Sequence, residues 1–253
     1  KALRIFAKTP TALAAFYRIR KGKKIIKPKK SLTFAENFFY MCFGKVPNKD
    51  IVKAFDVSLI LYAEHSFNVS TFTARTITSS LSDIHGAITG AIASLKGPLH
   101  GGANEEVMHM MNKIKKPENA LKWINNALKN KEVVMGFGHR VYKSGDSRVP
   151  TMRQYFGKVA KLKKDKKFEK IYDIVEKVMI KDKHIHPNVD YPTGTTYHLM
   201  GFDTDFFTPI FVISRITGWS AHIMEQHAAN KLIRPLASYK GSKHRKVLEL
   251  NQR

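Results

Sequence analysis

Apolar residues in this chain recur every three or four positions, and they nowhere alternate with polar residues over the length of a strand. The segment Phe34–Phe43 shows this recurrence, and it continues at Ile51, Phe55, Leu59 and Tyr62. Such spacing places one apolar stripe along a helix, whereas a half-buried strand needs a period of two. The sequence therefore predicts an all-α fold.

Capping residues and helix breakers divide the chain into predicted helices. Ser31 or Thr33 begins the first one, and Gly44 with Pro47 ends it. A second begins near Asn48 or Asp50. The remaining predicted helices cover residues 68–95, 104–114, 117–130, 151–163, 168–180, 195–200 and 209–229. Glycines and prolines predict breaks over 96–103 and 135–142, and an extended or turn-like segment over 186–194.

The composition narrows the class of protein. With 253 residues and 43% hydrophobic content, the chain can bury one large core or two smaller ones. It has no apolar run typical of a membrane span or signal peptide. Its single cysteine, Cys42, excludes a disulfide framework, and we expect a cytoplasmic or mitochondrial-matrix protein. Because the chain begins at Lys1 without an initiator methionine, we expect an N-terminal part to be missing.

The charge is strongly basic, with 44 Lys and Arg against 20 Asp and Glu, a net charge of +24. Residues 1–30 contain eleven basic residues and no acidic one. Such an excess favours anionic partners, namely nucleic acid, an acidic membrane surface or phosphorylated substrates. A solvated, lysine-rich surface is the alternative, and the sequence leaves both open.

Three glycine-containing breaks each contain one side chain suited to acid–base chemistry. His100 lies in Gly97-Pro-Leu-His-Gly-Gly-Ala-Asn, His139 in Gly136-Phe-Gly-His-Arg-Val-Tyr-Lys, and Asp190 in Pro187-Asn-Val-Asp-Tyr-Pro-Thr-Gly. Functional groups are concentrated on loops held by a rigid scaffold. Each residue alone has a structural alternative, such as a helix cap or a turn.

These three segments, in this order, resemble signature segments of the citrate synthase family. Phe207–Trp219 and Ile233–Tyr239 resemble two more, so the resemblance extends over nearly the whole chain. The sequence Gly145-Asp-Ser-Arg-Val-Pro is most similar to the 2-methylcitrate synthase branch. The resemblance implies condensation of propionyl-CoA or acetyl-CoA with oxaloacetate, an acyl transfer that forms a C–C bond and gives 2-methylcitrate or citrate plus CoA.

The resemblance also implies roles for individual residues. Asp190 would remove a proton from the acyl group, His100 would donate a hydrogen bond to the thioester oxygen, and His139 would polarise the oxaloacetate carbonyl. A weak base such as an aspartate, with an ordinary pKa of about 3.9, needs desolvation and placement to act here. Substrate binding would fall to His65, Arg148, Asn188, Phe211, Arg215 and Arg234. Arginine suits a dianion because its guanidinium forms two parallel bonds to a carboxylate.

The CoA cosubstrate would contact the segment matching the family's adenine-binding loop, with a basic residue at the phosphates: Val134, Met135, Gly136, Phe137, Gly138 and Lys143. The Gly-Phe-Gly pair alone is weak, since it lacks the third glycine of a dinucleotide fingerprint. We expect no tightly bound cofactor and no metal, because His222 and His227 do not form a His-Glu-x-x-His motif.

The family's architecture implies a large domain over 1–102 and 204–253, with its N-terminal part missing, and a small domain over 103–203. It implies a homodimer in which Arg234 reaches the partner's site, and no membrane partner. A second hypothesis follows from the charge: a non-catalytic homologue that serves as a basic structural or RNA-associated subunit of a larger assembly. Release of CoA thiol distinguishes the two hypotheses.

Overall fold

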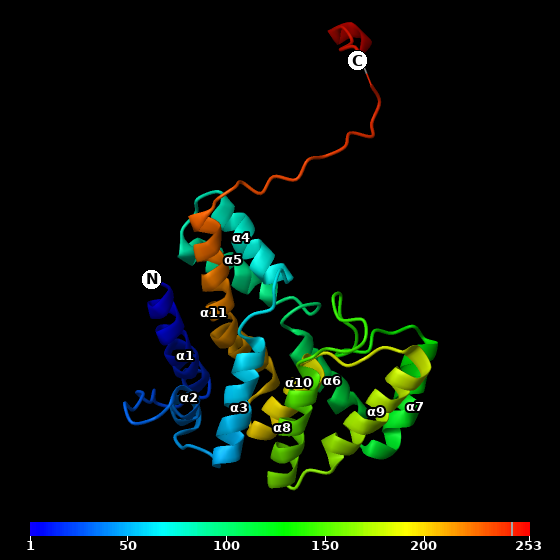
Figure 1. Ribbon diagram of the computed structural model, residues 1–253. Helices are drawn as coiled ribbons and strands as arrows, with labels where there is room; N and C mark the ends of the chain where they lie inside the picture. Colours follow the sequence, from blue (N-terminus) through cyan, green and yellow to red (C-terminus); the bar gives the residue numbers. More distant parts are fainter. Residues whose placement is uncertain (244) are drawn as a thin grey trace.

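The computed structural model describes residues 1–243 and 245–253 and consists of helices joined by loops (Figure 1). The helices are α1 Ala2–Ile19, α2 Phe34–Phe43, α3 Lys49–Tyr62, α4 Val69–Ser79, α5 Ile84–Leu95, α6 Ala103–Ile114, α7 Pro117–Lys129, α8 Val149–Leu162, α9 Lys167–Lys183, α10 Asp190–Met200 and α11 Phe207–Ala228, with 3₁₀ turns at Thr204–Phe206 and Leu250–Gln252. The described residues contain no β-strand, only one isolated bridge between Phe137 and Pro187. The all-α prediction is confirmed.

The predicted helix ends at α2 and α3 are confirmed by their capping geometry. The Thr33 hydroxyl accepts the backbone N–H of Glu36, whose carboxylate in turn accepts the backbone N–H of Thr33. Gly44 ends α2 in the left-handed conformation, and the Asn48 side chain caps α3. These groups satisfy backbone donors that have no partner inside a helix.

The single helix predicted over 68–95 is wrong. The structure has α4 and α5 packed against each other as a hairpin, with a turn between them in which Leu81 has a φ of +66°. The Asp83 carboxylate caps α5 by accepting the backbone N–H of Gly86. Asp83 therefore starts a new helix within a run of small residues. The apolar pattern continues across this position, so it does not show the break.

The structure differs from the predicted helices at two more places, the start of α10 and the N-terminal segment. The turn-like segment predicted over 186–194 extends only to Val189, because α10 begins at Asp190 and Pro192 lies in its first turn, where proline costs no backbone hydrogen bond. Helix α1 was not predicted. It lies in the basic N-terminal segment and contains Pro10 in its interior, a position that normally breaks a helix.

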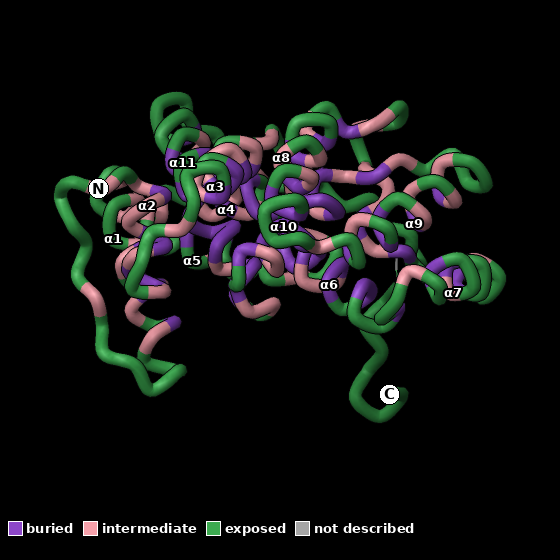
Figure 2. Tube along the Cα trace, turned by 90° about the horizontal axis from the view of Figure 1, so that it is seen from below, coloured by how far each residue is buried: buried purple, intermediate pink, exposed green. Residues whose placement is uncertain are grey.

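The core consists of two clusters of buried residues. Figure 2 colours buried residues purple, and many of them lie in the middle of the molecule. The larger cluster joins α1, α2 and α3 to α6–α10 and contains an aromatic group in which the rings of Phe38 and Phe55 stack 5.5 Å apart. The smaller one joins α4 and α5 to α11 and is centred on Trp219. Helix α11 contributes to both clusters, so it connects the two groups of helices.

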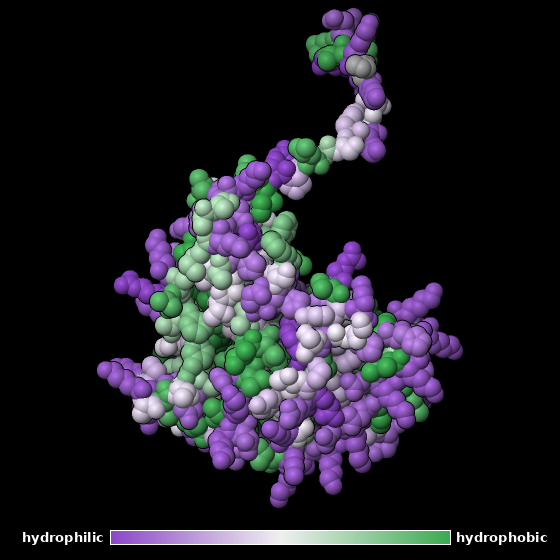
Figure 3. All heavy atoms as spheres, in the orientation of Figure 1, coloured by the Kyte–Doolittle hydropathy of each residue, from purple (hydrophilic) through white to green (hydrophobic). Residues whose placement is uncertain are grey.

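Hydrophilic side chains cover most of the face shown in Figure 3, especially around α7, α8 and α9. After α11, residues 229–243 leave the helical body without forming a helix (Figure 1), and Leu250–Gln252 form the second 3₁₀ turn. Of the helices in residues 1–243 and 245–253, none combines the length and the apolar character that crossing a membrane requires.

Candidate functional site

A cavity of about 580 Å³ lies where the three glycine-containing segments meet. His100, His139 and Asp190 all line it, although they are up to 90 positions apart in the sequence. Two of the predicted substrate residues, His65 and Asn188, line it as well. Gly138, from the predicted CoA segment, lines it too, so the structure brings six of the predicted site residues together around one space.

His100 lies in the turn between α5 and α6, and its Nε2 faces the start of α4. The backbone N–H of Ser70 donates to Nε2 over 3.3 Å, and the Ser70 hydroxyl oxygen lies 2.8 Å from the same nitrogen. Because a backbone N–H can only donate, the neutral ring carries its proton on Nδ1. Burial, together with the charge of Arg215, lowers the pKa of His100 to about 4. His100 is thus a neutral hydrogen-bond donor at physiological pH.

His139 lies in the loop between α7 and α8 and has the opposite tautomer. Its Nδ1 accepts the backbone N–H groups of Val141 and Tyr142 over 3.0 and 3.3 Å. The neutral ring therefore carries its proton on Nε2. Burial and the charge of Arg148 lower its pKa, so this imidazole is also neutral near pH 7.

Asp190 is the first residue of α10, and its carboxylate accepts a 2.5 Å hydrogen bond from the Tyr62 hydroxyl. Asn188 holds this helix start in place: its Oδ1 accepts the backbone N–H of Asp190, while its Nδ2 donates to the carbonyl of Gly138. Burial raises the pKa of Asp190 to about 6, against the lowering effects of Tyr62 and Arg148. The carboxylate is a stronger base than an ordinary aspartate, yet it is mostly ionised at pH 7.

Arg215 is a buried cation with a residue exposure of 1%, and although it lines neither cavity, its charge acts on the pKa values of His100 and Asp190. Its Nε donates to the carbonyl of Tyr62 over 2.6 Å, and its guanidinium lies over the Phe211 ring at 4.7 Å. Its Nη1 has no hydrogen-bond partner among the described residues. Burial and the charge of Arg148 lower its pKa to about 10, which still leaves it charged. A buried guanidinium with a free donor is suited to binding an anion.

Two predicted substrate residues are paired with neighbours that the sequence analysis did not identify. Arg148 forms a bidentate ion pair with Asp146, over 2.9 and 2.7 Å, and Asp146 also accepts the backbone N–H of Val189. His65 Nε2 lies 3.0 Å from the Tyr142 hydroxyl. Burial and the charge of Arg148 lower the pKa of His65 to about 4.

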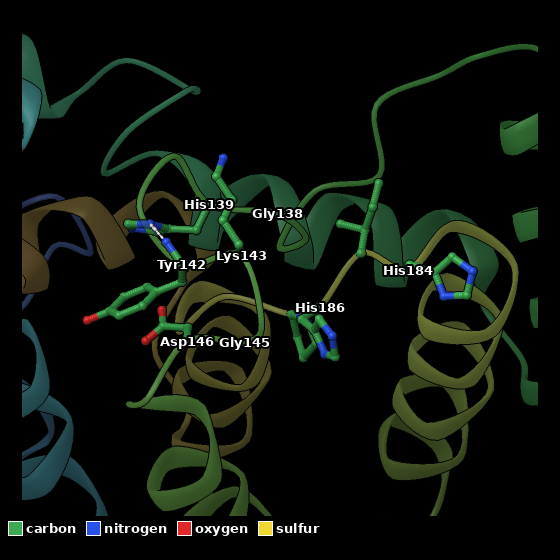
Figure 4. A pocket seen from close by; sticks show the side chains of 10 residues that line it. Gly138, His139, Tyr142, Lys143, Gly145, Asp146, His184 and His186 are labelled. Carbon is green, nitrogen blue, oxygen red and sulfur yellow. Dashed lines mark hydrogen bonds between the residues drawn. The ribbon is translucent and has the colours of Figure 1, made fainter.

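The predicted CoA segment borders a second cavity of about 190 Å³, shown in Figure 4. Gly138 and Lys143 from the predicted set line it, and His184 and His186 lie on its other side. Gly138 and His139 line both cavities, so the two spaces are adjacent. Gly136 is required at its position, because it has a φ of +84° and a Cβ there would lie 2.7 Å from Val107.

The other residues of the predicted CoA segment do not line the second cavity. Val134 is buried, Met135 and Phe137 are partly buried, and the Phe137 ring packs on Tyr191 at 4.5 Å. Arg234, by contrast, lies outside both cavities in the extended segment after α11, where it donates to the carbonyl of Pro235. Within residues 1–243 and 245–253, no group of three or more His, Cys, Asp or Glu side chains is arranged to hold a metal ion.

Four residues missed by the sequence analysis complete the contacts of the site: Ser70, Tyr62, Asp146 and Tyr142. Two of them had a local signal, since Asp146 precedes Arg148 by two positions and Tyr62 precedes His65 by three. The contact between Ser70 and His100 has no such signal, because it depends on how α4 packs beside the turn after α5.

Comparison with known proteins gives concordant matches. Residues 1–236 match the family described as citrate synthase, C-terminal domain. A 2-methylcitrate synthase of Mycobacterium tuberculosis is 54% identical over 245 residues, which are 97% of this chain and 62% of that protein. A citrate synthase of Mycolicibacterium smegmatis is 53% identical over 248 residues, 98% of this chain and 66% of that protein.

Solved structures agree with these relatives. The citrate synthase of Thermotoga maritima superposes with a TM-score of 0.90 at 38% identity, covering 100% of this chain and 70% of that one. The citrate synthase of Thermoplasma acidophilum, solved as a ternary complex with carboxymethyl coenzyme A and oxaloacetate, superposes with a TM-score of 0.90 at 36% identity, covering 100% of this chain and 68% of that one. This chain spans slightly less than two thirds of the two curated relatives named above. The chain belongs to the citrate synthase family.

Proposed function

We propose that the protein condenses an acyl-CoA with oxaloacetate, giving citrate or 2-methylcitrate plus CoA. The observation that carries this proposal is the convergence of His100, His139 and Asp190 on one cavity. The buried Arg215, whose Nη1 has no partner among the described residues, is near enough to act on the pKa values of His100 and Asp190. Two neutral imidazoles with opposite tautomers, one carboxylate with a raised pKa and a buried cation are the groups that an enolate condensation on a dianion requires.

Oxaloacetate binds in the main cavity in this proposal. Arg215 has a donor to spare for one of its carboxylates, and His65 lies at the cavity wall to donate another hydrogen bond. Arg148 contributes positive charge from its ion pair with Asp146, which holds the guanidinium plane in a fixed orientation. A rigid, preorganised cation binds a carboxylate without losing side-chain entropy.

The proton transfers are assigned by the hydrogen bonds of each group. Asp190 takes a proton from the α-carbon of the acyl-CoA, and the Nδ1–H of His100 donates to the thioester oxygen as negative charge develops there. The enol carbon attacks the keto carbon of oxaloacetate, and the Nε2–H of His139 supplies the proton to the new alcohol. Water then cleaves the thioester, which releases free CoA thiol and the tricarboxylate.

The acyl-CoA chain enters beside the second cavity. Its reactive end reaches the main cavity past Gly138, which lines both spaces, and Lys143 lies where it can contact a phosphate. Propionyl-CoA and acetyl-CoA differ by one methylene. A pocket that accepts or excludes one methylene in general discriminates between two substrates by about 1–3 kcal/mol of activation free energy. The named relatives include both kinds of enzyme, at 53% and 54% identity.

The assay for this function measures release of free CoA thiol from propionyl-CoA and from acetyl-CoA, each with and without oxaloacetate. We expect oxaloacetate-dependent release, faster with propionyl-CoA if the chain resembles the 2-methylcitrate branch in activity as it does in sequence. Absence of release with both substrates would remove the enzyme hypothesis. RNA binding that weakens steeply with salt would then favour the non-catalytic, basic subunit.

The quaternary and domain arrangement is part of the same proposal. Helices α6–α10, within 103–203, form a smaller domain that closes over the cleft against the rest of the chain, and such closure excludes water from the reaction. Because Arg234 lies away from both cavities of its own chain, it acts in the site of a second copy in a homodimer.

A further inference from the structure

The segment Ala63–Asn68, here called the His65 loop, connects α3 to α4 and lines the main cavity with His65 and Phe67. Its backbone is strained, since Ser66 has a φ of +49°, in the left-handed region that serine rarely adopts. Such a conformation persists only where surrounding contacts hold it. Contacts with α11 and α4 hold this loop at the cavity.

Helix α11 holds the beginning of the loop. The backbone N–H of Gly218 donates to the carbonyl of Ala63 over 3.0 Å, and the Thr217 hydroxyl donates to the same carbonyl over 3.2 Å. A Cβ on Gly218 would lie 2.5 Å from that oxygen, so the loop touches the helix backbone. This contact fixes the start of the loop but not its middle, where His65 and Ser66 lie.

His222, one helical turn after Gly218, reaches the middle of the loop. Its Nε2 lies 3.0 Å from the Glu64 carboxylate, and its Nδ1 lies 3.0 Å from Nη1 of Arg75 on α4. Because a guanidinium can only donate, Nδ1 accepts and the Nε2–H donates to Glu64. Against the effect of burial, His222 and the nearby backbone N–H of Ser66, the strained residue, lower the pKa of the Glu64 carboxylate.

Arg75 completes the cluster from the other side. Its guanidinium lies 5.1 Å from the centre of the Phe67 ring, which belongs to the loop, and the same group pairs with the exposed Glu225. The side chains of Arg75 and His222 are only 13% and 14% exposed, whereas the two carboxylates that they contact, Glu64 and Glu225, are 52% and 69% exposed. None of Glu64, Arg75 and His222 lines the main cavity as the structure describes it.

From these contacts we infer that Glu64, His222 and Arg75 form a positioning cluster that fixes the His65 loop so that His65 faces oxaloacetate. This inference rests on the proposed function. The cluster joins α4, α11 and the loop through one histidine whose tautomer is set by its two neighbours. It acts through His65 and does not touch the substrate, so its loss should weaken oxaloacetate binding more than the chemical step.

A matched pair of substitutions tests the inference, Glu64→Ala and Glu225→Ala. Both remove a carboxylate that contacts the His222–Arg75 pair, but only Glu64 belongs to the loop. We expect Glu64→Ala to raise the KM for oxaloacetate about tenfold, with kcat changed less than about threefold, because a hydrogen bond to a charged group is lost. Glu225→Ala should leave the KM within about twofold, because Glu225 lies on α11 and is not part of the loop.

The direction of the KM change in Glu64→Ala distinguishes a positioning role of Glu64 from a purely electrostatic one. Glu64 lies near enough to Arg215 to act on its pKa, so removing the carboxylate through electrostatics alone would strengthen binding of a dianion and lower the KM. A raised KM therefore indicates a misplaced loop. Glu64→Gln keeps an acceptor for the His222 Nε2–H, and we expect it to recover most of the affinity.

A second pair of variants acts at the centre of the cluster. His222→Gln can still accept from Arg75 and donate to Glu64, whereas His222→Phe can do neither. We expect a raised KM in the phenylalanine variant and near-normal binding in the glutamine variant. Equal KM values for wild type, Glu64→Ala and His222→Phe would overturn the inference while thiol release by the wild type stands. Absence of thiol release by the wild type would instead refute the proposed function. If Glu64→Ala does not fold, the two His222 variants decide.

Discussion

Asp190 differs from an ordinary aspartate in its pKa, which burial raises. Its pKa of about 6 exceeds the unfolded value of about 3.9, so the native state binds more protons than the unfolded state between pH 4 and 6. Its contribution to stability therefore becomes less favourable as the pH rises through that window. Above pH 6 the site maintains a buried charge at the expense of stability.

Replacing Asp190 with asparagine should thus separate activity from stability. We expect Asp190→Asn to lower kcat by about 10²–10⁴-fold, since a general base is lost, without loss of oxaloacetate binding. At pH 7.5 it should raise the free energy of unfolding by up to about 3 kcal/mol, and near pH 4 this gain should vanish. Urea denaturation at both pH values measures the effect. Undiminished turnover would show that another group is the base.

The pH dependence of kcat/KM follows from the same carboxylate. We expect the rate to fall tenfold per pH unit below about pH 6, because Asp190 must be ionised, while His65 and His100, with pKa values of about 4, stay neutral. The Tyr62 hydroxyl stabilises the ionised form, so Tyr62→Phe should shift the midpoint of this fall upward by about one unit. An unchanged midpoint in Tyr62→Phe would mean that another group controls the acid limb.

Sequence reasoning placed the candidate side chains better than their partners. The motifs around His100, His139 and Asp190 identified residues that the structure brings together at one cavity. Their protonation states depend on contacts with Ser70, with Tyr62 and with backbone N–H groups, which arise only when distant segments pack. The raised pKa of Asp190 is likewise a product of burial, and no local pattern encodes its size.

At the scale of the helices, capping residues predicted where a helix begins or ends better than the apolar pattern predicted how far it continues. Thr33, Gly44 and Asn48 mark helix ends through their own side chains or backbone freedom, and these predictions are confirmed. The division between α4 and α5 depends on Asp83 competing as a cap inside an otherwise continuous pattern. Helix α1 is held by its packing against α2 and α11, which the basic sequence around it does not show.

The close approach of α10 to α6 gives a test at this scale. A Cβ on Gly194 of α10 would lie 2.4 Å from the backbone oxygen of Asn104 on α6, whereas one on Gly157 of α8 would meet nothing closer than 3.6 Å. We expect Gly194→Ala to lower the free energy of unfolding by about 1–3 kcal/mol through overpacking. Gly157→Ala, the matched control, should raise it by about 0.5–1 kcal/mol through helix propensity. Denaturant titration compares them, and equal effects would show that the two helices separate easily.

At the scale of the whole molecule, the position of Arg234 predicts a dependence on a second copy. If Arg234 acts in the partner's site, Arg234→Ala and Asp190→Asn should each be nearly inactive alone. A refolded equimolar mixture should recover about a quarter of wild-type activity, because half of the random dimers are hybrids and each has one intact site. A mixture as inactive as its components would place Arg234 and Asp190 in the same site or in none.

The contacts of Trp219 have a consequence for the fluorescence of the protein. The chain has two tryptophans, and this one is fully buried, with its indole N–H donating to the Ser70 hydroxyl that lies against His100. A ligand that draws the His100 ring toward itself must disturb the hydrogen bond of the indole. In a Trp123→Phe background, the intrinsic fluorescence of the protein would therefore report events at the imidazole directly, without an added label.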